Sequence, residues 1–339
     1  MRIGLLVDYR GCFWSSTTNV RTGTTMNVSR ISELLSDAGH EPDVMEFADV
    51  DLGQRWHGVP VVFTSAEDRG LAYKGYIEDI VLALESAGAR TFPRFPLLRA
   101  HHNKVFMELL RKQLAPETFL SRETRTFGAF EEFQPRVGEV PMPAVVKSAA
   151  GAGSSGVRLV ATLPEALIAA RSLSQSDPRL EEVRELAKQR LRPGYRRTST
   201  HRSKFIVQPL IPNLRGDFKV LKYGRRYFAV YRGNRAEVAM ASGGGLLDFD
   251  VDSHVDVEAL LAFAADFAEA VANPWLSMDI AHVDGGFQLI EFQALHFGPA
   301  TLEKSEFHYL QDDRGGFQCV PGQMELEQAF VDALCDELN

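Results

Sequence analysis

Short apolar runs alternate with amphipathic stretches over the first hundred residues. Residues 2 to 8 form a compact apolar run that ends in a charged loop, as a buried strand does. Residues 26 to 38 carry apolar side chains at helical spacing and are followed by a glycine, a common helix stop. Apolar runs at 43 to 47 and 61 to 64 and a helical stretch at 76 to 84 continue the alternation. The pattern predicts a parallel α/β unit.

The middle of the chain has shorter elements around a glycine-rich turn. A helix with a basic face is predicted at residues 100 to 114. A strand at 144 to 147, a turn of small residues at 151 to 156 and a strand at 157 to 160 follow, and 164 to 173 has helical spacing. Strands and helices therefore alternate around this turn.

A polar stretch comes next, at residues 174 to 204, and its part from 184 to 204 is rich in Arg and Lys. Two interpretations stay open. One is a solvated helix followed by a mobile loop. The other is a cover that meets an anionic substrate or ATP phosphates.

The last third of the chain is rich in predicted strands. Residues 205 to 211, 217 to 223 and 226 to 231 have strand composition, with a tight turn at Gly224-Arg225. Two more strands, 276 to 282 and 287 to 292, form a hairpin across Asp284-Gly285-Gly286. Helices are predicted at 257 to 271 and 323 to 338.

Composition narrows the class of protein. The chain has 339 residues and a formal net charge of −8, which weighs against a nucleic-acid partner. Its three cysteines, Cys12, Cys319 and Cys335, are far apart and form no CxxC pair, so neither a zinc site nor a disulfide framework is indicated. The apolar run at the start is too short for a signal peptide, and no stretch is long enough to span a membrane. We expect a cytoplasmic protein without a membrane or nucleic-acid partner.

Lys147 ends a predicted strand and is followed by a loop of small residues that includes Gly153, Ser154, Ser155 and Gly156. Small residues let backbone N–H groups approach phosphate oxygens closely, and the lysine adds a positive charge. The loop is not a P-loop, because GxxxxGK[ST] is absent and a strand follows. A plain hairpin turn is the alternative interpretation.

Two acids and an amide lie on the strands of the last hairpin. Asp279 is on the first strand, and Glu291 and Gln293 are on the second. Residues two apart face the same side of a strand, so Glu291 and Gln293 share a face that the hairpin can bring beside Asp279. Their oxygens suit Mg²⁺ that bridges phosphates. Solvent-facing residues of an edge hairpin are the alternative.

The strand at 205 to 211 breaks at Pro209. Such a break exposes backbone groups that the strand ladder does not use, and these can bind an adenine edge while apolar side chains cover the ring. Lys219, two residues beyond Asp217, then returns toward the phosphates. A buried, kinked strand is the alternative.

The order of these features resembles the ATP-grasp superfamily, which includes D-alanine–D-alanine ligase, glutathione synthetase and the ribosomal-protein glutamate ligases. Asn103-Lys104 on a helix comes first, then Lys147 with its loop, the hinge at 208 to 211, Lys219 and finally the acid pair. Several stretches, among them Glu291-Phe292-Gln293, are similar to a bacterial group that we associate with surface-polysaccharide and natural-product loci. The resemblance implies an ATP-grasp fold with an N-terminal parallel α/β domain. Its parts would be an N-terminal α/β domain at 1–99, a central α+β lid subdomain at 100–207 and a C-terminal α+β subdomain with the metal site at 208–339.

The resemblance also implies roles for single residues and the cofactors ATP and Mg²⁺. The residues implied to bind ATP are Lys104, Lys147, Gly153, Ser154, Ser155, Gly156, Gln208, Pro209, Leu210, Ile211, Asp217 and Lys219. Those implied to act at the transferring phosphate and the acyl phosphate are Arg232, Arg235, Ser242, Gly243 and Gly244. Asp279, Glu291 and Gln293 would hold Mg²⁺.

The implied activity is an ADP-forming ligase that activates a small-molecule carboxylate as an acyl phosphate and passes it to an amine. Val238-Ala239-Met240 stands where the family usually has an Asp-Phe-Arg triplet, which leaves open a catalytically altered ATP-binding protein. A kinase that phosphorylates a small molecule is a further alternative. Since homodimers are common in the superfamily, the oligomeric state stays open between monomer and homodimer.

Overall fold

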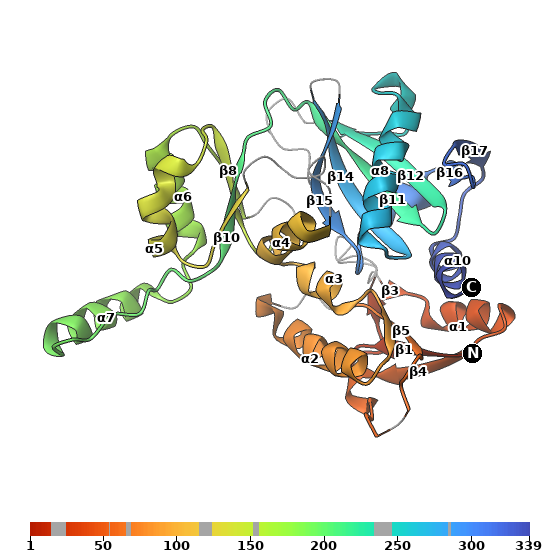
Figure 1. Ribbon diagram of the computed structural model, residues 1–339, viewed down its shortest axis with the longest axis horizontal. Helices are drawn as coiled ribbons and strands as arrows, with labels where there is room; N and C mark the ends of the chain where they lie inside the picture. Colours follow the sequence, from red (N-terminus) through yellow and green to blue (C-terminus); the bar gives the residue numbers. More distant parts are fainter. Residues whose placement is uncertain are drawn as a thin grey trace. The chain divides into compact units, whose positions relative to one another are not determined.

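A computed structural model describes residues 1–14, 25–53, 55–65, 69–114, 124–151, 156–233, 246–283 and 286–339. The chain divides into two compact units. The first combines residues 1–101 with residues 215–339, and the second contains residues 102–214. Figure 1 shows the elements of each unit. The three-part division at 99 and 207 stays a prediction beside this two-unit arrangement.

The N-terminal part of the first unit is a parallel sheet in the order β4-β1-β5-β6. Its strands are β1 (Arg2–Val7), β4 (Glu41–Glu46), β5 (Pro60–Phe63) and β6 (Arg90–Phe92). The helices are α1 (Val28–Asp37), α2 (Ala72–Ser86) and α3 (Phe95–Ala100), and β2 (Phe13–Trp14) pairs with β3 (Thr25–Met26). Strands β1 and β5 are apolar nearly throughout because both of their faces are buried. The predicted parallel α/β unit is confirmed.

The C-terminal part of the first unit is built on an antiparallel sheet in the order β15-β14-β11-β12-β16-β17, with β13 paired to β12. Its strands are β11 (Gly216–Tyr223), β12 (Arg226–Gly233), β13 (Leu246–Asp248), β14 (Trp275–Val283), β15 (Gly286–Gln293), β16 (Phe307–Gln311) and β17 (Phe317–Pro321). The helices are α8 (Val257–Val271), α9 (Ala300–Lys304) and α10 (Leu326–Leu338). Both predicted hairpins of this region are present.

The two parts of the first unit share a hydrophobic core. Ile31 of α1 and Leu5 of β1 belong to the same cluster as Trp275 of β14 and Phe330 of α10. The Trp275 and Phe330 rings lie 4.2 Å apart, centroid to centroid. This burial of large aromatic side chains explains why the chain ends pack as one unit although more than a hundred residues separate them.

The second unit is a smaller α+β structure. Its antiparallel sheet has the order β7-β10-β8-β9, with β7 (Arg125–Phe127), β8 (Ala144–Ser148), β9 (Val157–Val160) and β10 (Phe205–Pro209). Its helices are α4 (Lys104–Leu114), α5 (Phe130–Phe133), α6 (Leu163–Leu173) and α7 (Arg179–Leu191). Phe127, Phe133 and Phe205 pack against one another in its core. The expected α+β subdomain is therefore observed.

The sequence pattern misplaced the start of one helix. The helix predicted at 100 to 114 begins only at Lys104, because His102 has a positive φ of 52° and Asn103 accepts a hydrogen bond from the Phe106 N–H. Part of the basic stretch forms α7, in which Arg184 pairs with Glu181 and Lys188 with Glu185.

Among the described residues, no helix combines the length and apolar character that a membrane crossing requires.

Candidate active site

Six polar side chains lie on one face of the large antiparallel sheet of the first unit. They are Asp217, Lys219, Arg232, Asp279, Glu291 and Gln293. The strand register puts them there, because residues directly opposite in antiparallel strands share a face. Asp217 is opposite Arg232, Lys219 is opposite Asp279, and Asp279 is opposite Glu291. The proposed metal residues therefore lie side by side, as the alternation predicts.

The other face of the same sheet is apolar and is covered by α8 (Figure 1). Phe267 of α8 contacts Phe292 of β15, with ring centroids 5.2 Å apart. Phe292 is opposite Met278, which is fully buried. The alternation of buried apolar and polar residues along β11, β14 and β15 thus leaves the polar face for chemistry.

The polar face holds a connected cluster of charges. Arg232 donates to both carboxylate oxygens of Asp217, from Nε and Nη2, each at 2.7 Å. Its Nη2 also lies 3.0 Å from Oδ2 of Asp279, and Lys219 Nζ donates to Oδ1 of Asp279 at 3.2 Å. The Asp217 side chain is only 7% exposed, so its charge depends on this pairing.

The cluster moves the pKa values of its acids in opposite directions. Burial raises the pKa of Asp217 above its usual value, although the Arg232 guanidinium opposes the effect. Burial also acts on Asp279, but the positive charges of Lys219 and Arg232 outweigh it and lower the pKa of this carboxyl to about 2. Asp279 is therefore ionised at neutral pH, as a metal ligand must be.

The donor set of this face fits Mg²⁺. Asp279 and Glu291 provide carboxylate oxygens on neighbouring strands, and Gln293, opposite Ser277, provides an amide oxygen on the same face. Mg²⁺ prefers such hard oxygen donors and keeps several water or phosphate ligands besides. Lys219 and Arg232 both contact Asp279, so the two cations lie beside the carboxylate that would hold the metal.

The second unit carries the two predicted phosphate-binding lysines. The Lys104 backbone N–H donates to Ala149 O at 2.9 Å, and Lys104 Nζ donates to Gly151 O at 3.0 Å. Lys104 is therefore held against the start of the glycine-rich loop. Lys147 lies on β8 opposite Ile206 of β10, two residues before the Ala149 that Lys104 contacts. Both lysines thus attach to the same strand–loop segment.

The predicted adenine hinge is the end of β10. The Leu210 N–H donates to Pro143 O at 3.0 Å, so this donor is used by the sheet. Gln208 is buried, and its side-chain amide donates to Glu108 at 3.0 Å and to Thr124 at 3.2 Å. A base contact from Gln208 would therefore use its backbone, as the resemblance implies, because the side chain supports α4. Pro209 ends the paired strand and Ile211 follows it.

Several predicted site residues lie outside the described residues. They are Gly153, Ser154, Ser155, Arg235, Ser242, Gly243 and Gly244, together with Val238-Ala239-Met240. Gly156 is described and closes the loop, with its carbonyl accepting from the Ser148 N–H at 2.9 Å. A Cβ on Gly156 would lie 1.9 Å from Ser148 Oγ, so a larger residue at this position would require the Ser148 hydroxyl to turn away.

The pairing of Asp217 with Arg232 was not predicted, although the sequence contains the signal for it. The turn at Gly224-Arg225 pairs Tyr223 with Arg226, and counting back along both strands brings Asp217 opposite Arg232. Register follows from turn position in a two-residue hairpin. The roles assigned to Asp217 at the nucleotide and to Arg232 at the transferring phosphate stay predictions.

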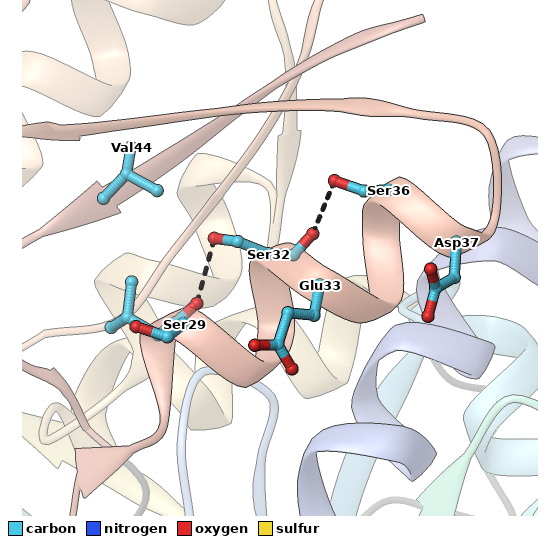
Figure 2. A pocket seen from close by; sticks show the side chains of 7 residues that line it. Ser29, Ser32, Glu33, Ser36, Asp37 and Val44 are labelled. Atoms are coloured by element: carbon cyan, nitrogen blue, oxygen red, sulfur yellow. Dashed lines mark hydrogen bonds between the residues drawn. The ribbon is translucent and has the colours of Figure 1, made fainter.

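A surface hollow lies elsewhere, beside α1. It has a volume of about 710 Å³ and is lined by Val28, Ser29, Ser32, Glu33, Ser36, Asp37 and Val44 (Figure 2). The hydroxyls of Ser32 and Ser36 donate to carbonyls one turn earlier in the helix. None of the predicted site residues lines this hollow. The Ser32 and Ser36 hydroxyls therefore satisfy backbone carbonyls of their own helix.

Comparison with solved structures identifies the fold. An ATP-grasp RimK domain protein from Sphaerobacter thermophilus DSM 20745 matches with 18% identity and a TM-score of 0.51, over 99% of each chain. The D-cycloserine synthetase DcsG matches with 16% identity and a TM-score of 0.54, over 100% of each chain. The ATP-grasp ligase PsnB, in a complex with minimal precursor, Mg and ADP, matches with 15% identity and a TM-score of 0.50, over 99% of this chain and 97% of PsnB. No protein-family model and no curated protein matches the sequence. The chain has the ATP-grasp fold.

Proposed function

We propose that this protein is an ATP-dependent carboxylate–amine ligase that works through an acyl phosphate and releases ADP and phosphate. The observation that carries the proposal is the polar sheet face of an ATP-grasp fold, on which Lys219 and Arg232 lie beside the carboxylates of Asp279 and Glu291. The solved relatives support it, since their names describe a synthetase and a ligase with Mg and ADP bound.

The chemistry requires such a mixture of charges. A carboxylate is a poor electrophile, because its oxide is a bad leaving group. Transfer of the ATP γ-phosphoryl group to a carboxylate oxygen breaks the γ-phosphorus–oxygen bond to ADP and forms an acyl phosphate. The amine then attacks the acyl carbon, phosphate leaves, and the amine loses a proton. Cations must offset the charge of ATP and of the carboxylate at the same time.

The residues of the polar sheet face are proposed to have different roles in phosphoryl transfer. Lys219 and Arg232 would neutralise the transferring phosphoryl group, and Asp279, Glu291 and Gln293 would hold Mg²⁺. When bound, Mg²⁺ supplies positive charge to the phosphate oxygens. Asp217 fixes the Arg232 guanidinium by its bidentate contact, so that the cation is oriented before substrate arrives. Arg235, Ser242, Gly243 and Gly244 are proposed to border the acyl phosphate.

In the second unit, Lys104 and Lys147 are proposed to hold the α- and β-phosphates. Gly153, Ser154, Ser155 and Gly156 would close over the phosphates and exclude water, which would otherwise hydrolyse the acyl phosphate. The hinge from Gln208 to Ile211 would contact adenine. The proposed partners are a small-molecule carboxylate and an amine, in the cytoplasm.

The experiment that tests the proposal measures ADP release with Mg²⁺, ATP and a panel of amino acids and peptides. We expect turnover that depends on both substrates and falls by at least a hundredfold in Glu291→Ala. Glu33→Ala, which changes an exposed carboxylate on α1, serves as the matched control and should keep full activity. Unchanged turnover in Glu291→Ala would contradict the metal role.

A further inference from the structure

The N-terminal sheet has a topological switch point between β1 and β5. From β1 the chain continues through α1 to β4 on one side, whereas from β5 it continues through α2 to β6 on the other side. In open parallel sheets, ligands bind outside the carboxyl ends of the strands at such a point. Here those ends carry buried polar residues: Asp8 follows β1, and Thr64 and Ser65 follow β5. The two strand ends are linked, because the Trp14 N–H donates to Thr64 Oγ1 at 2.8 Å.

Asp8 is saturated by contacts from its own loop. Its side chain is 2% exposed, and its oxygens accept from the backbone N–H groups of Arg10 and Cys12 at 2.8 and 3.0 Å and from Trp14 Nε1 at 2.9 Å. Burial acts to raise the pKa of Asp8, but these hydrogen bonds outweigh it and the pKa is lowered. Asp8 is thus an ionised anchor, and its role is to position the groups around it.

Arg10 is the group that Asp8 positions. Its Nε and Nη2 both donate to Oδ2 of Asp8, at 3.1 and 2.8 Å. Its guanidinium carbon lies 4.5 Å from the Trp14 ring centroid and 5.2 Å from that of Tyr9. The Tyr9 ring is in turn supported edge-on by Tyr73 of α2, at 5.1 Å. The planar cation is therefore oriented by Asp8 and lies beside two aromatic rings.

One edge of this guanidinium is available to a ligand. The Arg10 side chain is 43% exposed, and among the described residues Nη1 has no hydrogen-bond partner. A guanidinium that is already oriented binds a planar carboxylate with little further loss of conformational entropy. We propose that Arg10, at the carboxyl edge of the N-terminal sheet, binds a carboxylate group of a small-molecule substrate. That the bound molecule is a substrate of ligation rests on the proposed function.

The fluorescence of Trp14 can report carboxylate binding at Arg10 directly. It contacts Arg10 and is partly exposed, whereas Trp56 and Trp275 are each only 1% exposed. The full chain, without nucleotide, is titrated with L-glutamate and with glutarate while tryptophan emission is followed. Glutaramide, the uncharged counterpart of glutarate, and inorganic phosphate are titrated at matched ionic strength. We expect a saturable change with at least one carboxylate and none with glutaramide or phosphate, and loss of the signal in Trp14→Phe.

Arg10→Gln should weaken carboxylate binding at least tenfold, and Arg10→Lys should give an intermediate loss because it keeps the charge but not the planar fork. Arg2→Gln is the matched control. Arg2 pairs with Asp43 and lies 4.9 Å from the Trp56 ring centroid, but at the opposite end of β1. It should leave carboxylate binding unchanged.

Three results would overturn the inference: no saturable change with either carboxylate, equal binding in Arg10→Gln, or equally tight binding of phosphate. Affinity for Mg-ATP is measured separately on the same variants. If the protein binds the carboxylate but no nucleotide, the proposed function is contradicted and the Arg10 site is supported. If it binds nucleotide but no carboxylate, the Arg10 site is contradicted and the proposed function is not.

Discussion

The contact between Asp217 and Arg232 allows a quantitative test of the charged cluster. The test is a double-mutant cycle that consists of Asp217→Asn, Arg232→Met and the double variant. Arg232→Met leaves Asp217 buried without its bidentate partner and brings it face to face with Asp279, since no guanidinium then separates the two carboxylates. Asp217→Asn leaves Arg232 with Asp279, so the smaller effect is expected from that change.

The magnitude follows from the burial of the pair. Opposite charges about 4 Å apart attract by about 4 kcal/mol at an effective dielectric constant near 20. Removing one partner of a buried pair costs about 3–5 kcal/mol, because the other charge stays buried. With side chains 14% and 7% exposed, we expect a loss of about 3 kcal/mol for Arg232→Met. The double variant should lose about 2 kcal/mol less than the sum of the single changes.

The assay is urea unfolding followed by tryptophan emission, because all three tryptophans, Trp14, Trp56 and Trp275, belong to the same unit as the pair. The matched control is a second cycle on Arg226 and Asp332, which pair at 3.0 Å with side chains 25% and 28% exposed. This more exposed pair should couple by less than about 1 kcal/mol. Additive losses in the Asp217–Arg232 cycle would refute the buried pairing.

The pH dependence of the destabilisation by Arg232→Met tests the burial of Asp217 independently. The pKa of Asp217 is raised in the folded protein, mainly by burial. A carboxyl whose pKa is higher in the folded than in the unfolded protein destabilises the fold when it is ionised. This destabilisation decreases as the pH falls from the folded pKa toward the unfolded pKa. The destabilisation by Arg232→Met should therefore shrink when the pH is lowered from 7 to 4. A destabilisation that grows over this range would contradict the burial argument.

Three further changes test other parts of the account. Asp279→Asn should lower the free energy of unfolding by about 2 kcal/mol above pH 4, because the pKa of Asp279 is lowered from 3.8 to about 2 in the folded protein. This difference from the wild type should disappear as the pH falls toward 2, and urea unfolding at pH 5, 4 and 3 measures it. Gly216→Ala should lower thermal stability by about 1–3 kcal/mol, because a Cβ would lie 2.4 Å from the Arg232 carbonyl oxygen. Gln208→Leu should destabilise the second unit by about 1–3 kcal/mol by removing a donor from buried Glu108, measured by amide hydrogen exchange in α4.

Much of the fold could be predicted because its strands have simple patterns. The apolar runs of β1 and β5 indicate strands buried on both faces, and the turn glycines mark the hairpins of the large sheet. The strands β16 and β17 were missed because their sequences, Phe307–Gln311 and Phe317–Pro321, mix polar and apolar residues without clear alternation. The two strands pair with each other across a short turn, and β16 also pairs with β12, about eighty residues earlier in the chain. Sequence periodicity does not contain the second pairing.

The candidate site was predictable in part for the same reason. Asp279, Glu291 and Gln293 could be placed on one face because strand periodicity fixes side-chain direction. The charge pairing could not be assigned from residue types alone: Lys219 and Arg232 both contact Asp279, whereas Asp217 pairs with Arg232 only through the register of β11 and β12. Burial, which raises the pKa of Asp217, depends on packing from elsewhere in the unit.

Trapping with hydroxylamine tests the central claim most directly. Hydroxylamine attacks an acyl phosphate in place of the amine and forms a hydroxamate, so only the carboxylate has to be found. With Mg²⁺, ATP and a panel of amino acids and peptides, we predict hydroxamate and ADP in equal amounts for at least one carboxylate, and neither in Glu291→Ala. ADP with a stable phosphorylated product and no hydroxamate would show a kinase, and nucleotide binding without turnover would show an ATP-binding protein without ligase activity; either result contradicts the account.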